Sequence, residues 1–185
     1  MGVTGLFGGA FDPPHNGHVE LARRARERFD LDPLVVLVSA RPGHKEVVLP
    51  ADFRLELARA AFPEADVRLD EHARTVDLLR DSDWDDPLFL IGADEFCDFP
   101  TWKEPDALLD LAHLAVATRP GFPRERLETV LRRLRRPDRV EFFEIDPWPV
   151  ASRDLRARLL AGEPVGDAVP PAVATLIEER RHYRV

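Results

Sequence analysis

Two histidines and two glycines share one short stretch near the start of the chain, and together they could bind phosphate. The stretch, GGAFDPPHNGH over residues 8–18, follows an apolar run and opens a helical pattern. Its glycines let phosphate approach the main chain, and a helix N-terminus attracts anions. His15 and His18 are three residues apart, so both rings could project from one side of the first helical turn. We expect them to stabilise charge during displacement at phosphorus, with Gly17 leaving room for a bulky substituent.

Three other interpretations fit this stretch less well. The spacing of Gly5, Gly8 and Gly9 does not match a GxGxxG dinucleotide fingerprint, and no GxxxxGK[ST] sequence occurs. A zinc site would need a third ligand beside the HxxH pair and often has HExxH spacing. Each histidine alone could be a helix cap or a surface residue, but the double glycine, Phe-Asp-Pro and HxGH together favour a phosphate site.

Apolar runs alternate with helical patterns along the chain. The runs are bounded by glycine, proline or aspartate and predict buried parallel strands at Val3–Phe7, Leu34–Val38, Val67–Leu69, Pro87–Ile91, Leu114–Thr118 and Val140–Ile145. Amphipathic patterns over Gly17–Phe29 and Asp52–Phe62 predict helices between them. The alternation indicates an α/β fold with a doubly wound parallel sheet, whose ligands bind at the carboxyl ends of the strands.

The C-terminal part has a different pattern. Ser152–Leu160 and Pro171–Arg181 predict two helices with no strand between them, and we expect this portion, residues 150–185, to cap the sheet. A length of 185 residues suits a single domain spanning 1–185. The arginine-rich run Arg124–Arg139 is expected to be the solvated face of a helix rather than a nucleic-acid site.

Composition limits the class of partner. A net charge of −8 argues against a general nucleic-acid or membrane-surface binder, so a polyanionic ligand would need a local basic pocket. The lone Cys97 excludes a disulfide framework and a cysteine-rich zinc site. No apolar run approaches the ~18 residues of a membrane span, and the first residues lack a signal-peptide pattern. We therefore expect a cytoplasmic protein.

The 8–18 stretch resembles the (H/T)xGH signature of the nucleotidyltransferase superfamily. It is most similar to the form GG(S/T)FDPxHxGH, the signature of bacterial nicotinate-nucleotide adenylyltransferases. Further segments are similar to that family's motifs in the same order: PGHK at 42–45, TVDLL at 75–79, GAD at 92–94, FPTW at 99–102, RPG at 119–121 and VASRDLR at 150–156. The resemblance covers nearly the whole chain and implies a Rossmann-like nucleotidyltransferase fold.

The resemblance also implies a reaction. The phosphate of nicotinate mononucleotide attacks the α-phosphorus of ATP, pyrophosphate leaves, and deamido-NAD forms, a step of NAD biosynthesis. A phosphate monoester has a second pKa near ~6, so it needs no general base, only positioning and charge neutralisation. Mg²⁺ is the implied ion, bridging the phosphates of ATP without a dedicated protein site. The expected partners are ATP and a mononucleotide, with no nucleic acid and no membrane.

Residue roles follow from the same resemblance. It implies His18, and then His15, on the α- and β-phosphates of ATP, with Ser152 and Arg156 on the β- and γ-phosphates. Asp94 would bind ribose hydroxyls and Trp102 would stack on the pyridine ring. The full sets are His15, His18, Lys45 and Arg156 for catalysis; Gly8, Gly9, Ala10, Phe11, Gly92, Asp94 and Ser152 for ATP; and Ala40, Arg41, Arg74, Thr75, Trp102 and Arg119 for the acceptor.

Several of these residues also have plain structural explanations. Trp102 could belong to the core, and Asp94 could only cap a helix. Lys45, one of only two lysines, could be a loose surface residue instead of a charge on the triphosphate. Arg156 could pair with Asp154 or face solvent, and Arg119 could be structural.

Departures from the family pattern gather on the acceptor side. Val38-Ser39-Ala40-Arg41 replaces a more polar run, Ala73-Arg74 replaces Ser-Tyr, and Ala151 and Arg153 replace a serine and a threonine. Arg41 and Arg74 could strengthen recognition of an anionic acceptor, or they could be neutral changes in variable loops. The alternatives are a related adenylyl- or cytidylyltransferase acting on nicotinamide mononucleotide or phosphopantetheine, and a nucleotide-binding module without turnover.

Overall fold

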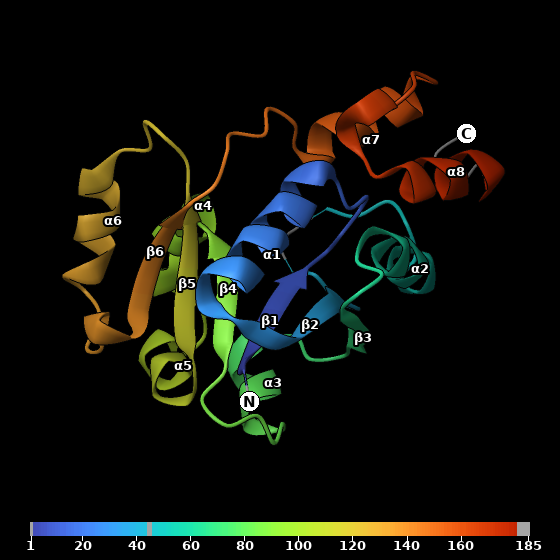
Figure 1. Ribbon diagram of the computed structural model, residues 1–185. Helices are drawn as coiled ribbons and strands as arrows, with labels where there is room; N and C mark the ends of the chain where they lie inside the picture. The colour runs from blue at the N-terminus through green and yellow to red at the C-terminus, as the bar shows by residue number, and fades with distance from the viewer. Residues whose placement is uncertain (1, 44–45, 181–185) are drawn as a thin grey trace.

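The centre of the molecule is a six-stranded sheet in which each pair of neighbouring strands is parallel, in the order β3-β2-β1-β4-β5-β6 (Figure 1). The computed structural model describes residues 2–43 and 46–180. The strands are β1 (Val3–Gly9), β2 (Leu31–Ser39), β3 (Asp66–Asp70), β4 (Leu88–Gly92), β5 (His113–Thr118) and β6 (Val140–Glu144). The predicted doubly wound α/β sheet is confirmed. Its order reverses on either side of β1, so the ligand crevice is expected at the carboxyl ends of β1 and β4.

Helices cover both faces of the sheet (Figure 1). On one face the core is completed by α1 (Asn16–Phe29), α2 (Ala51–Ala61), α7 (Ser152–Leu160) and α8 (Pro171–Arg180). On the other face it is completed by α3 (Thr75–Arg80), α4 (Ala93–Asp98), α5 (Pro105–Leu111) and α6 (Arg124–Leu131). Three short 3-10 turns complete the described elements: η1 (Phe99–Thr101), η2 (Pro137–Arg139) and η3 (Gly166–Ala168).

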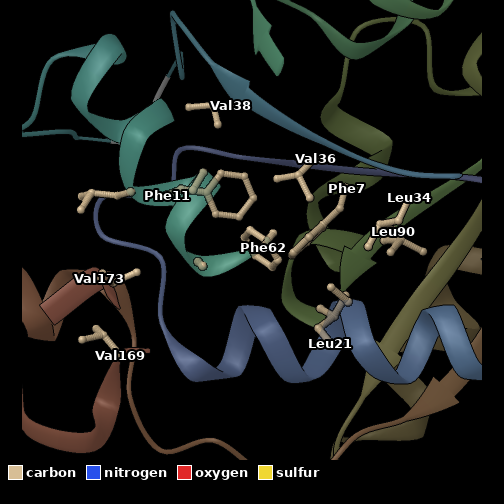
Figure 2. Packing of buried hydrophobic residues seen from close by; sticks show 14 of the residues in the cluster. Phe7, Phe11, Leu21, Leu34, Val36, Val38, Phe62, Leu90, Val169 and Val173 are labelled. Atoms are coloured by element: carbon tan, nitrogen blue, oxygen red, sulfur yellow. The ribbon is translucent and has the colours of Figure 1, made fainter. Parts of the chain in front are cut away.

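Burial on both faces explains the continuous apolar runs of the strands. Along β2, Leu34, Val36 and Val38 face the α1 side, whereas Val35 and Leu37 face the α4 side. All five are at most 6% exposed. Because successive side chains point to opposite faces, a strand covered on both sides needs an apolar residue at nearly every position. Figure 2 shows the α1-side core, with β-strand side chains packed against Leu21 of α1.

The first two strands are longer than the apolar runs predict. β1 continues over Gly8 and Gly9, which pair with Leu37 and Val38 of β2, so both glycines belong to the strand and not to the turn after it. β2 begins at Leu31, three residues before the predicted start. Backbone pairing in the sheet extends these strands beyond what side-chain hydropathy indicates.

The C-terminal helices share a core with the sheet. Leu155 of α7 and Val173 and Ile177 of α8 are at most 5% exposed and pack in the same cluster as α1 and α2. Figure 1 shows α8 beside α2 and α7 near the start of α1, at the end of the sheet toward which β1 runs. Among the described residues, no helix is long and apolar enough to cross a membrane.

The arginine-rich run is helical over only part of its length. α6 ends at Leu131, and its Leu127 and Val130 are buried. Beyond it, Arg135 forms ion pairs with Asp106 and Asp110 of α5. The charge of Arg135 is thus compensated within the chain, as is typical of a solvated surface.

Candidate active site

A cavity of about 470 Å³ opens at the carboxyl ends of the strands, where the sheet order predicts a ligand crevice. We call it the strand-end cavity. Part of its wall is apolar and comes from the core of the α4 side: Leu37, Leu78, Phe89, Ile91 and Leu108. Gly8, Gly9 and Ala10 at the end of β1 contribute main chain to the wall. An apolar pocket with polar residues at its rim suits a flat ring that carries charged substituents.

Four of the six residues expected to bind the acceptor line this cavity: Arg41, Arg74, Thr75 and Trp102. The Trp102 ring packs edge-on against Phe89 and tilted against Phe99, at 6.4 and 5.4 Å between centroids. It is therefore part of the core boundary and part of the cavity wall at once. Ala40 lies beside Arg41 and donates its N–H to the Asp70 carbonyl at 2.8 Å.

Charges of both signs surround the strand-end cavity, and sequence reasoning missed several of them. His72 lines the cavity, and its ring bonds the carboxylates of Asp70 at 2.8 Å and Asp81 at 3.2 Å. The hydrogen bond with Asp70, reinforced by Asp81, raises the pKa of His72. Lys103 also lines the cavity and pairs with Asp77 at 2.7 Å. Only their place in the chain could have indicated His72 and Lys103, because His72 follows β3 and Lys103 follows η1.

The two histidines of the HxGH stretch lie face to face. The rings of His15 and His18 are stacked with centroids 3.7 Å apart and planes 26° apart. The main-chain N–H of His15 donates to Nδ1 of the His18 ring at 3.2 Å. In the neutral ring that bond makes Nδ1 the acceptor and fixes the tautomer that carries its proton on Nε2. The Phe11 ring packs against the His18 ring in an edge-to-face contact, with 5.3 Å between the centroids.

His15 is uncharged at neutral pH. Burial lowers the pKa of its imidazole from 6.5 to about 4. Its Nδ1 is buried and has no hydrogen-bond partner among residues 2–43 and 46–180. A buried polar atom without a partner costs free energy, which a ligand that supplies a partner would recover.

Three residues of the 8–18 stretch have packing roles that the sequence did not predict. The Phe11 side chain is 2% exposed and points into the core with Phe7 and Phe62, as Figure 2 shows, so its side chain does not face the cavity. A Cβ on Gly9 would lie 2.8 Å from that ring. The space expected above Gly17 is already filled, because a Cβ there would lie 3.0 Å from the His15 ring and 3.1 Å from Cβ of Trp148.

α7 brings two more candidate residues to the same turn. Ser152 Oγ donates to the Pro13 carbonyl at 3.0 Å, and Arg156 Nη1 donates to the Asp12 carbonyl at 2.9 Å. Residues 139 and 144 positions away thus lie directly against the HxGH stretch. His15, His18, Ser152 and Arg156 form what we call the histidine cluster, which lies beyond the end of β1. The alternative that Arg156 only pairs with Asp154 is not what the structure shows.

The remaining candidates lie at the end of β4 and β5. Gly92 is the last residue of β4 and the N-cap of α4, so Asp94 does not cap that helix. Asp94 lines the strand-end cavity, and its carboxylate lies 3.8 Å from the guanidinium of Arg119. Arg119 itself does not line the cavity. Lys45 lies outside the described residues.

No protein-built metal site is evident in the part of the chain that the structure describes. It contains no group of three or more His, Cys, Asp or Glu side chains that could hold a metal ion. The arrangement offers two imidazoles, an arginine, a hydroxyl and main-chain groups, and residues 8–10 of the same stretch line the apolar cavity. These groups can neutralise and orient phosphates while the cavity holds a second substrate.

Comparison with known proteins gives a consistent picture. Residues 6–158 match the family described as Cytidylyltransferase-like. A probable nicotinate-nucleotide adenylyltransferase of Thermus thermophilus is 36% identical, over 97% of this chain and 98% of its own. Its counterpart in Rubrobacter xylanophilus is 34% identical, over 98% of this chain and 92% of its own. The fold is similar to that of Plasmodium falciparum nicotinic acid mononucleotide adenylyltransferase complexed with NaAD, with a TM-score of 0.77, 17% identity and coverage of 99% and 98%.

Proposed function

This chain belongs to the nicotinate-nucleotide adenylyltransferase family, and from that membership we propose that it transfers the adenylyl group of ATP to the phosphate of nicotinate mononucleotide. A phosphate oxygen of the mononucleotide forms a bond to the α-phosphorus of ATP. The bond between the α-phosphorus and the oxygen that bridges it to the β-phosphate breaks, and pyrophosphate leaves. The product is deamido-NAD, which makes the protein an enzyme of NAD biosynthesis. The observation that carries the proposal is the stacked His15–His18 pair, in the stretch whose residues 8–10 line the same cavity as Trp102.

The chemistry needs no general base. The attacking phosphate is already mostly ionised at neutral pH, because its second pKa is near ~6. What limits the reaction is the approach of one anion to another, so neutralisation and alignment supply the rate enhancement. The histidine cluster provides both, since all four residues converge on one turn from α1 and α7.

His18 is proposed to contact the α-phosphate. Its Nδ1 accepts the main-chain N–H of His15, which fixes the orientation of the ring, and we propose that Nε2–H donates to a non-bridging oxygen when ATP binds. Negative charge on that oxygen grows as the new bond forms, so the hydrogen bond strengthens in the transition state. His15 is proposed to contact the β-phosphate and to take up a proton as the triphosphate arrives, because a nearby anion favours the imidazolium.

Ser152 and Arg156 are proposed to hold the β- and γ-phosphates. Arg156 uses one N–H to fix the Asp12 carbonyl, and a guanidinium has further donors for phosphate oxygens. Mg²⁺ is proposed to enter with ATP and to be held by phosphates and water. Lys45, four positions after Arg41 in the sequence, stays a candidate for the triphosphate.

The strand-end cavity is proposed to hold the acceptor. Trp102 would stack on the pyridine ring, with Thr75 and Ala40 beside it, and Arg41 and Arg74 would face the anionic groups. Asp94 would bind ribose hydroxyls, held in place by Arg119. Gly8, Gly9, Ala10, Phe11 and Gly92 are proposed to bind ATP instead, and Phe11 would do so through its main chain because its side chain is in the core.

The test is pyrophosphate release from ATP and Mg²⁺ with three acceptors: nicotinate mononucleotide, nicotinamide mononucleotide and phosphopantetheine. We expect kcat/KM to be highest for nicotinate mononucleotide and to fall sharply in His18→Ala. The double change Arg41→Gln and Arg74→Gln should reduce the ratio of kcat/KM for nicotinate mononucleotide to kcat/KM for nicotinamide mononucleotide. Equal turnover of both by the wild type would refute an anion-selective pocket, and a preference for phosphopantetheine would refute the assigned acceptor.

A further inference from the structure

One arginine lies in the interior, outside both the strand-end cavity and the histidine cluster. Arg54, in the first turn of α2, is 1% exposed. Placing a guanidinium inside a protein costs free energy unless its donors are satisfied, and an apolar side chain of similar volume would fill the same space at lower cost. Core packing alone therefore does not account for an arginine here.

The hydrogen bonds of Arg54 go to main-chain carbonyls from three segments. Nη1 donates to Ala10 at 2.8 Å and to Ser39 at 2.7 Å. Nε donates to Leu49 at 3.1 Å, and Nη2 lies 3.5 Å from the carbonyl of Ala40. Ala10 opens the stretch that carries the two histidines, whereas Ser39 and Ala40 open the loop that carries Arg41.

These carbonyls lie where two strands part. The pairing of β1 with β2 ends at Gly9 and Val38, so Ala10 and Ser39 are no longer paired with each other, although Ser39 still pairs with Asp70 of β3. Arg54 bonds both strands at that point, and one guanidinium nitrogen bridges Ala10 to Ser39. The Arg54 side chain therefore helps to fix the position of one loop relative to the other.

A buried carboxylate fastens the same two loops from the other side. Asp12 is 1% exposed, and its Oδ2 accepts the N–H of Val48 at 2.5 Å, with the N–H of Leu49 at 3.5 Å. Leu49 is also the residue whose carbonyl binds Arg54. The carbonyl of Asp12 in turn accepts from Arg156, so the fastening reaches the histidine cluster.

We propose that Arg54 is a positioning residue for adenylyl transfer: it sets the distance between the histidine stretch, which holds ATP, and the loop after β2, which holds the acceptor. This inference rests on the proposed function. In-line displacement requires the attacking oxygen and the α-phosphorus to meet within a narrow range of distance and angle, and a misplacement of about 1 Å can cost ~100-fold in rate. Losing Arg54 should therefore lower kcat far more than it raises either KM.

The experiment compares Arg54→Lys and Arg54→Met with Leu57→Val. Lysine keeps the charge but cannot bridge two strands with one planar group, and methionine keeps much of the volume without a donor. Leu57 lies one turn further along α2, is 0% exposed, and has no part in the loops. All proteins are assayed well below their melting temperatures, with kcat and the KM of both substrates measured.

Both Arg54 variants should remain folded and lose about 10- to 100-fold in kcat, while Leu57→Val should melt earlier and keep the kcat of the wild type. If the Arg54 variants keep wild-type kcat, or if neither folds, the side chain serves stability alone and the inference is overturned. Failure of the proposed function is distinguishable, because it would show as wild-type protein inactive with every acceptor.

Discussion

The buried imidazole of His15 makes the stability of the fold depend on pH in a way that can be measured separately from other groups. Burial lowers the pKa of His15 from 6.5 to about 4 in the folded chain. As pH falls, the unfolded chain binds this proton first, so the stabilisation from neutral His15 is complete above pH 6.5 and is lost as pH falls toward 4. Linkage then gives a loss of about 2 kcal/mol at pH 5 relative to pH 8.

The assay is urea unfolding of the wild type and of His15→Gln at several pH values between 8 and 5. Carboxylates and other histidines titrate in both proteins, so they cancel in the difference between the two free energies of unfolding. Between pH 8 and pH 5 the free energy of unfolding of the wild type should fall by about 2 kcal/mol more than that of His15→Gln. Two curves that stay parallel within error would refute the claim that His15 is held neutral by burial. Saturating ATP should shrink the shift, since bound phosphate would stabilise the protonated ring.

Three substitutions test the rest of the site. Gly17→Ala places a Cβ 3.0 Å from the His15 ring, so kcat should fall at least ~10-fold with KM for the acceptor unchanged; an unchanged kcat would show that the ring stack does not matter. Trp102→Ala should raise KM for the mononucleotide about 10-fold or more and leave KM for ATP unchanged, and Trp102→Phe should bring KM for the mononucleotide most of the way back. An unchanged KM for the mononucleotide in Trp102→Ala would show that the ring only packs in the core. Arg156→Lys keeps the charge but loses the planar guanidinium, one N–H of which binds the Asp12 carbonyl while the others are proposed to bind phosphate oxygens; it should therefore weaken binding of ATP about 10-fold in calorimetry, and equal affinity would contradict a phosphate role.

The sheet could be predicted from the sequence because burial on both faces leaves a direct trace in composition. Each predicted strand corresponds to an observed one, since a run such as Leu34–Val38 has no other stable place than a covered strand. The ends of strands left no such trace, because the pairing of Gly8 and Gly9 with β2 depends on main-chain hydrogen bonds. The helices α3 and α4 were not predicted, because six residues are too few to show a 3.6-residue period.

Part of the candidate site could also be predicted from the sequence. The spacing of His15 and His18 is a local property, so their shared face could be predicted, and the stacked rings agree with it. The contacts of Ser152 and Arg156 with residues 12 and 13 span most of the chain and needed the family resemblance to be anticipated. The burial of Phe11, Asp12 and Arg54 left no signal, because nothing in a single sequence marks which charged residue will be internal.

Adenylyl transfer itself is most directly tested by following a mixture of the protein, ATP, Mg²⁺ and nicotinate mononucleotide with phosphorus NMR and mass spectrometry. The account predicts one pyrophosphate for each deamido-NAD formed, no phosphate released by hydrolysis, and no product from His18→Ala although it still melts like the wild type. Binding of ATP without any dinucleotide, from this acceptor or from nicotinamide mononucleotide or phosphopantetheine, would contradict it.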